Sequence, residues 1–183
     1  TTPDGRTYEI ESYYNGTFFY MTTNNVDAAK TISTNKLWPG GSTGLDLTGS
    51  GQTLGEWDAG KVRETHQELV GRVTQVDNSP NWHNHATHVA GTMIASGVEA
   101  KAQGMSYEAT LDAYDWNDDE SEMLSAAANG LRVSNHSYGL ITGWYYNFFG
   151  DGRWTWFGHR GVDDEEDFYF GAYTESSQGW DEV

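Results

Sequence analysis

The sequence lacks cysteine and is poor in positive charge, and each shortage excludes a class of function. With no Cys among 183 residues, disulfides, thiolate metal sites and a cysteine nucleophile are excluded. Ten Lys and Arg stand against 27 Asp and Glu, which gives a formal net charge of −17. Contacts with phosphate need clustered Lys and Arg, and none are clustered here. We therefore expect binding neither to nucleic acid nor to an anionic membrane surface.

Long hydrophobic runs are also absent, because no stretch approaches the roughly 18 consecutive apolar residues of a membrane span. Aromatic residues, by contrast, are abundant: eight Trp, eleven Tyr and seven Phe. Rings bury large areas, so the composition favours a globular domain over a disordered chain. The length allows one domain. An acidic chain without Cys is compatible with bacterial secretion, and we expect a secreted protein.

Hydrophobic periodicity and turn residues predict an α/β domain. Strands are predicted in these regions: 7–23 as a hairpin around Asn15-Gly16, 51–57, the later part of 62–76 after a turn within that segment, 109–114 and 131–137. Helices are predicted in these: 25–36, 84–96 with a cap at Asn84, 120–129 closed by Gly130, and 163–177 with an acidic start. Strand and helix alternate in the middle of the chain, which is typical of a parallel sheet. Residues 140–161 are rich in aromatics without a clean period and predict a long loop or an irregular hairpin.

Two short motifs carry the chemistry. DAG at 58–60 follows a predicted strand, and HATHVAGT at 85–92 opens a predicted helix. A histidine at a helix N-terminus meets the positive end of the dipole, which favours the neutral form that a general base needs. An aspartate at the carboxyl end of a strand can accept a hydrogen bond from the other ring nitrogen and so fix the tautomer.

These motifs resemble, in sequence and in order, the Asp and His motifs of the subtilase family of subtilisin-like serine endopeptidases, D-[ST]-G and H-G-T-H-V-A-G-T. Further matches are GSG at 49–51, HQEL at 66–69, GMS at 104–106 and SYG at 137–139. Ala59 and Ala86 depart from the family pattern. The resemblance covers roughly residues 25–140 and implies a three-layer α/β fold with a mostly parallel sheet. This chain would hold its N-terminal part: a hairpin extension over 1–24 and an incomplete core over 25–183.

The resemblance also implies the catalytic roles. His85 is the general base, Asp58 orients it, and His88 is a structural histidine. The G-T-S-M-A motif of the nucleophilic serine is absent from the 183 residues, as is the A-G-N strand of the oxyanion asparagine. We therefore expect a secreted serine endopeptidase of peptides or proteins, completed by a separate C-terminal chain that supplies both residues. The chemistry needs no cofactor, and the fold is compatible with structural Ca²⁺.

Substrate residues follow from the same resemblance. In subtilases the peptide lies as an extended strand between two enzyme segments. The matching segments here are Asp115-Trp116-Asn117 and Ser137-Tyr138-Gly139. Trp116 and Tyr138 would line pockets next to the cleaved bond. Acidic side chains at 115 and 118–120 either favour basic side chains at outer subsites or form a solvated acidic turn.

Three other interpretations of these residues are open. His83, His85 and His88 form H-x-H-x-x-H, which could bind zinc in a metal-dependent hydrolase, although H-E-x-x-H is absent. NHSYG at 135–139 is similar to a nucleophile elbow, but its first Gly is missing and Asp58 and His85 precede the serine in the wrong order. The aromatic run at 144–157 could make the chain a non-catalytic binding module that stacks sugars. No metal ligand is assigned.

Overall fold

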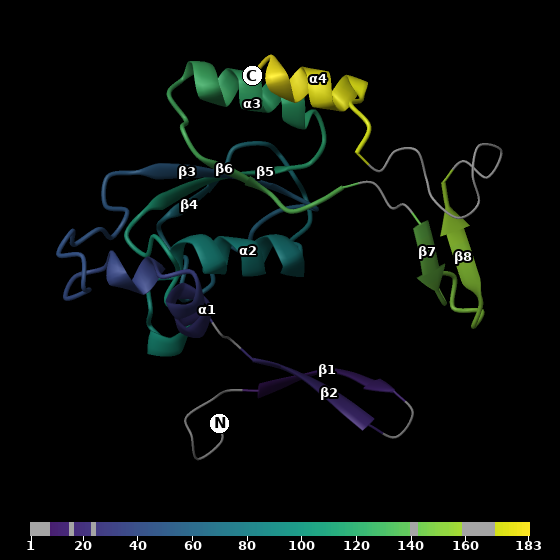
Figure 1. The fold of residues 1–183 in the computed structure, drawn as a ribbon, viewed down its shortest axis with the longest axis horizontal. Coiled ribbons are helices and arrows are strands. Elements are labelled where there is room, and N and C mark those ends of the chain that lie inside the picture. The colour runs from purple at the N-terminus through teal and green to yellow at the C-terminus, as the bar shows by residue number, and fades with distance from the viewer. Residues whose placement is uncertain (1–7, 15–16, 23–24, 140–142, 159–170) are drawn as a thin grey trace. The chain divides into compact units, whose positions relative to one another are not determined.

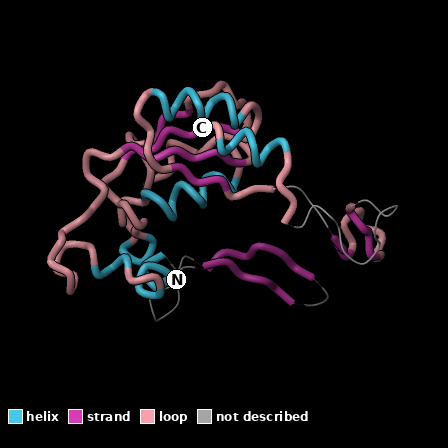
Figure 2. Tube along the Cα trace, turned by 45° about the horizontal axis from the view of Figure 1, so that its top comes forward, coloured by secondary structure: helices cyan, strands magenta, loops and turns pink. Residues whose placement is uncertain are grey.

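The computed structural model describes residues 8–14, 17–22, 25–139, 143–158 and 171–183. These residues fall into two compact units, and each has its own helices and strands (Figures 1 and 2). Unit 1 comprises residues 1–117 and 131–136, and unit 2 comprises residues 118–130 and 137–183. No helix in the described ranges is long and apolar enough to cross a membrane.

A parallel four-stranded sheet forms the centre of unit 1 (Figure 1). Its strands, in spatial order, are β4 (Val73–Gln75), β5 (Thr110–Asp115), β3 (Thr53–Asp58) and β6 (Ser134–His136). All three pairings are parallel, and Asp58 is in register with Asp115. The carboxyl ends of β3 and β5 therefore meet at one edge of the sheet, where ligands of such sheets bind. The predicted α/β class with a parallel sheet is confirmed.

Helix α2 (Asn84–Ile94) lies along one face of this sheet (Figure 1). Ala86, Ala90 and Ile94 recur at a spacing of four residues and are fully buried. The two alanines let the helix approach closely, because they add almost no side-chain bulk. Around them the core of unit 1 is built from small and aliphatic side chains: Val62, Leu69, Ala109, Leu111 and Ala113.

Short elements complete unit 1. They are the antiparallel hairpin of β1 (Tyr8–Tyr14) and β2 (Thr17–Thr22), helix α1 (Asn25–Thr31) and the 3₁₀ turns η1 (Thr34–Lys36) and η2 (Ala100–Ala102). The predicted N-terminal hairpin is confirmed, while its turn, Asn15-Gly16, lies outside the described residues. The predicted helix over 25–36 is interrupted, because Ser33 adopts a left-handed backbone conformation with φ of 68°.

In its described residues, unit 2 holds two helices and a hairpin. Helices α3 (Asp119–Ala128) and α4 (Glu175–Asp181) lie side by side (Figure 2), with Gly179 of α4 against the carboxyl group of Glu120. Gly130 follows α3 with φ of 97°, as predicted for a closing glycine. Strands β7 (Gly143–Tyr146) and β8 (Trp154–Phe157) form an antiparallel hairpin in the aromatic region, which confirms the predicted irregular hairpin.

Two predicted helix ends are wrong. The N-cap position of α2 is His83 instead of Asn84, without a capping hydrogen bond from the side chain, and the helix ends at Ile94. Within the described residues, the part of the helix predicted over 163–177 that is present starts at Glu175, where Thr174 and Ser177 form a reciprocal capping box, and this helix runs to Asp181. Residues 171–174 are not helical, and residues 159–170 lie outside the described residues.

Candidate active site

A close approach of two loops brings the end of β3 to the start of α2. The backbone N–H of Lys61 donates to the carbonyl of Asn81 at 2.9 Å, and that of His83 donates to the carbonyl of Lys61 at 2.8 Å. Gly60 makes this approach possible, because a Cβ there would lie 3.0 Å from the Asn81 oxygen. The glycine of the DAG motif therefore sets the distance between the aspartate strand and the histidine helix.

Asp58 and His85 are joined by a hydrogen bond at this junction. Nδ1 of His85 lies 2.8 Å from Oδ2 and 2.9 Å from Oδ1 of Asp58. The side chain of Asp58 is 1% exposed and that of His85 is 51% exposed. An ionised carboxylate only accepts, so Nδ1 carries the proton, and in the neutral ring the lone pair is on Nε2. The ring therefore has its basic nitrogen free for chemistry and its other nitrogen anchored to the protein.

The aspartate is held from two further sides. The backbone N–H of Ala59 donates to Oδ1 of Asp58 at 2.7 Å. On the opposite face of the sheet, the buried ring of Trp57 stacks on Tyr114 at 4.1 Å and on His136 at 5.1 Å between centroids. This stack spans three neighbouring strands, β5, β3 and β6, and so fixes the end of β3 that carries Asp58.

Glu56 is a buried acid that sequence reasoning missed. It is fully buried on β3, and neither of its carboxyl oxygens has a hydrogen-bond partner within the described part of the chain. Burial, with a smaller effect of the Asp58 charge, raises the pKa of Glu56 to about 9. The sequence contained a signal for this residue, because an acid two positions before Asp58 on a predicted strand lies on the same face of the strand as Asp58.

Glu68 is a second acid whose role the sequence did not reveal. Its Oε2 accepts from the backbone N–H groups of Gly97 at 2.8 Å and Val98 at 3.0 Å, and its Oε1 accepts from Glu99 at 2.7 Å. The hydroxyl of Ser96 donates at 3.2 Å. Burial alone would raise the pKa of Glu68, but these hydrogen bonds outweigh it and lower the pKa. The carboxylate thereby holds the loop that follows α2.

One predicted substrate segment follows β5 in unit 1. The backbone N–H of Asp115 donates to Asp77, and Oδ1 of Asp115 accepts from the backbone N–H of Asn117 at 2.8 Å and from its side-chain amide at 2.7 Å. Trp116 is 47% exposed. The carboxylate of Asp115 therefore stabilises a local turn. For this residue, the observation favours the predicted acidic turn over a subsite for basic side chains.

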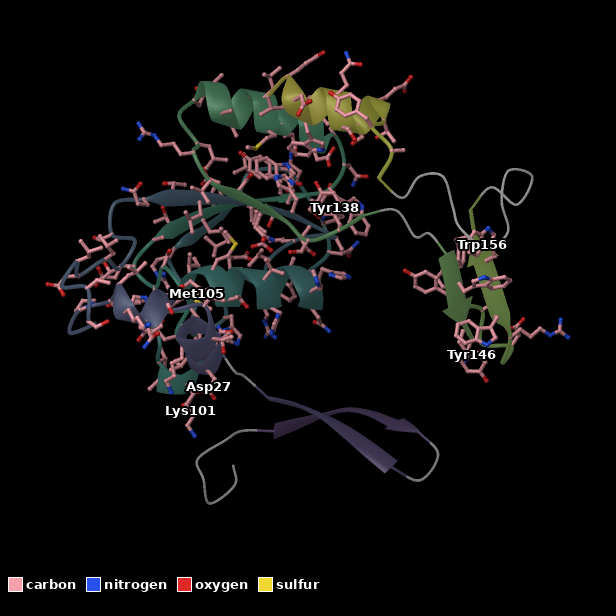
Figure 3. All side chains as sticks on the ribbon, viewed as in Figure 1. Asp27, Lys101, Met105, Tyr138, Tyr146 and Trp156 are labelled. Atoms are coloured by element: carbon pink, nitrogen blue, oxygen red, sulfur yellow. The ribbon has the colours of Figure 1, made fainter. Side chains whose placement is uncertain are left out.

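The other predicted substrate segment, Ser137-Tyr138-Gly139, begins the second part of unit 2. The hydroxyl of Tyr138, which is labelled in Figure 3, donates to Oδ2 of Asp119 at the start of α3 over 2.6 Å. A Cβ at Gly139 would meet no atom within 4 Å. Because the two segments belong to different units, their joint role in binding a peptide stays a prediction.

The alternative sites gain no support from the geometry. Over the described ranges, no group of three or more His, Asp or Glu side chains could hold a metal ion, and these ranges include His83, His85 and His88. Neither zinc nor calcium is therefore assigned to particular residues. Ser137 does not sit at a strand-to-helix turn either, because the next described element after it is strand β7.

The aromatic hairpin packs largely on itself. Trp144 contacts Trp156 at 5.3 Å between ring centroids, and Tyr146 contacts Trp154 at 5.4 Å across the strands; Tyr146 and Trp156 are marked in Figure 3. Trp144, Tyr146 and Trp154 are nevertheless exposed.

Comparison with known proteins identifies the family. A search of curated proteins gave no match. The sequence model of the subtilase family matches residues 14–181, which is most of the chain. The match includes both halves of the Asp58–His85 pair, and the parallel α/β sheet agrees with it. The chain therefore belongs to the subtilase family, a family of serine peptidases.

Proposed function

We propose that this chain supplies the acid–base half of the active site of a secreted serine endopeptidase. The observation that carries the proposal is the hydrogen bond of 2.8 Å between a buried Asp58 and a half-exposed His85. Membership of the subtilase family supports hydrolysis of peptide bonds with a serine nucleophile. The acidic composition without Cys supports secretion.

In the proposed mechanism, Nε2 of His85 takes the proton of a serine hydroxyl as the serine oxygen attacks the carbonyl carbon of the substrate. The same nitrogen then gives this proton to the leaving amine. Asp58 stays ionised, keeps the proton on Nδ1 and stabilises the imidazolium that forms. Its burial makes this stabilisation stronger than it would be in water.

The serine and the oxyanion asparagine are proposed to come from a separate C-terminal chain. Neither G-T-S-M-A nor an A-G-N strand occurs among the 183 residues, so in this proposal both residues lie outside them. Peptide or protein substrates would pair as an extended strand with residues 115–117 and 137–139. The mechanism uses no cofactor, and a role for Ca²⁺ would be structural.

The test uses the complete protein, a fluorophosphonate probe and three histidine variants. We expect the probe to label a chain other than the 20.4 kDa chain after separation under denaturing conditions and mass spectrometry. We expect His85→Ala to lower kcat/KM by about 10⁴-fold, because the general base is lost. His83→Ala and His88→Ala are matched controls, since both side chains are exposed and neither contacts Asp58, and each should stay within about threefold of wild type.

Two results would contradict the proposal. The first is near wild-type activity of His85→Ala. The second is an equal loss in all three variants together with recovery on adding Zn²⁺, which would establish the metal-dependent hydrolase instead.

A further inference from the structure

The carboxyl group of Glu56 has no part in the mechanism above, although it lies next to the proposed catalytic pair. Glu56 is 0% exposed, and both Oε1 and Oε2 are without a hydrogen-bond partner in the described ranges. Side chains alternate along a strand, so Glu56 and Asp58 lie on the same face of β3. This is the face against which α2 presents His85. A buried, unbonded acid therefore lies directly behind the Asp58–His85 pair.

The surroundings of Glu56 contain few other charges. Its register partners are Ala113 on β5 and Asn135 on β6, and both are neutral. The titratable groups at this end of the sheet include Asp58 on its own strand, His85 on α2 and Asp115 at the end of β5. Asp77, which follows β4, is a further one, and its carboxylate accepts from the backbone N–H of Asp115. Asp112 and His136 occupy the opposite face, where Asp112 is in register with Gly55 and His136 stacks on Trp57. The remaining titratable group on α2 is His88, which is exposed.

A carboxyl group in this position is unfavourable for folding. A buried polar group without a hydrogen bond costs about 1–3 kcal/mol, and an ionised one costs far more. The neighbouring positions Leu54, Gly55 and Trp57 are apolar, and an apolar residue at 56 would continue the pattern. Local rules are broken at such cost mainly at functional positions.

We propose that Glu56, whose buried and unbonded carboxyl group lies on the same face of β3 as Asp58, is a positioning residue of the Asp58–His85 pair: a negative charge on this carboxyl group stabilises the imidazolium of His85. This inference rests on the proposed role of His85 as general base. On ionisation the proton of Glu56 passes to hydroxide in solution, and no other group changes. Because the imidazolium forms in the transition state, the second charge accelerates the reaction at alkaline pH. The burial that holds this carboxyl neutral places the change near pH 9.

The test compares the complete wild-type protein with Glu56→Gln, which retains the shape of the neutral acid. We expect the ratio of kcat/KM, wild type over variant, to rise about fivefold between about pH 7 and about pH 10.5. Asp112→Asn is the matched control, because Asp112 is a carboxyl on the neighbouring strand that faces away from the pair. Its ratio to wild type should not change with pH. Circular dichroism at each pH checks that all three proteins remain folded.

A second readout does not depend on hydrolysis. In protein labelled with ¹⁵N-histidine, the ring signals of His85, assigned by their loss in His85→Ala, should show an additional step near pH 9. Glu56→Gln should abolish this step, and Asp112→Asn should keep it. A constant activity ratio, or a His85 signal without the step, would overturn the inference. If the protein cleaves no peptide at any pH, the proposed function fails, and the NMR step alone decides the role of Glu56.

Discussion

At the residue scale, a single carboxylate holds the loop that follows helix α2. Glu68 accepts hydrogen bonds from three consecutive backbone N–H groups, those of residues 97–99. We expect Glu68→Gln to lower the free energy of unfolding by about 2 kcal/mol at pH 7, because the amide NH₂ faces backbone donors and leaves them unsatisfied. Urea denaturation of the two proteins measures this difference.

The stabilisation by Glu68 should depend on pH. The hydrogen bonds lower the pKa of Glu68 from its ordinary value of 4.5, so the stabilisation is complete above that value and is lost as the pH falls through the lower pKa of the folded state. The difference between wild type and Glu68→Gln should therefore shrink in acid. Equal stability at pH 7, or a difference that grows in acid, would contradict this account.

Prediction from sequence at this scale depended on local motifs. Asp58 and His85 were identified from the residues of their motifs and from the order of these motifs along the chain. In the structure the two side chains are hydrogen-bonded, and their catalytic roles remain predictions. The role of Glu68 could not be predicted, because its partners lie about thirty residues further along the chain in a loop without a periodic pattern. Glu56 could have been noticed, since it interrupts an apolar strand.

At the element scale, the end of α2 is fixed by the segment that follows η2. The backbone N–H groups of Met105 and Ser106 donate to the carbonyls of Thr92 and Met93 at 2.9 and 2.8 Å, which satisfies the last turn of the helix. Gly104 precedes them, and a Cβ there would lie 2.5 Å from the backbone nitrogen of Ala95. No side chain fits at position 104 unless the helix shifts.

This contact predicts opposite effects of two glycine substitutions. Gly104→Ala should lower the free energy of unfolding by about 2–3 kcal/mol, because its Cβ meets backbone atoms. Gly91→Ala, in the interior of α2, meets no atom within 4 Å and should raise it by about 0.5–1 kcal/mol, since alanine favours the helix. Chemical denaturation of both variants measures the contrast. Similar effects of the two changes would show that the end of α2 is not held in this way.

The existence of elements was easier to predict than their ends. The strands of unit 1 were found from their apolar runs and turn residues. The start of α2 at Asn84 was predicted, but its N-cap residue was not, because His83 is held by the backbone of Lys61, a long-range contact that a local capping preference does not reveal. The acidic run at 163–167, which suggested a helix N-terminus, lies outside the described residues. The described helix α4 starts at Glu175, where Thr174 and Ser177 supply a capping box.

At the scale of the whole molecule, most of the proposed site residues belong to one of the two compact units. Asp58, His85 and Glu56 all belong to unit 1, as does the segment 115–117. Unit 2 contributes only the predicted substrate segment 137–139. The family match extends over both units. The acid–base pair therefore depends on the folding of unit 1 alone.

The charge of the whole chain predicts how its stability depends on salt. A net charge of −17 repels itself in the folded state, and the few described ion pairs, such as Lys61–Glu64 at 3.0 Å, are on the surface and contribute little. Salt screens the repulsion, since the Debye length falls from about 30 Å at 0.01 M to about 3 Å at 1 M. We expect the midpoint of thermal unfolding at pH 7 to rise by about 3–6 °C over this range of NaCl.

Repeating the measurement near the pI of 4.4 is the control, because the net charge is then close to zero and the rise should vanish. A midpoint that falls with salt at pH 7 would mean that attractive pairs outweigh the net repulsion.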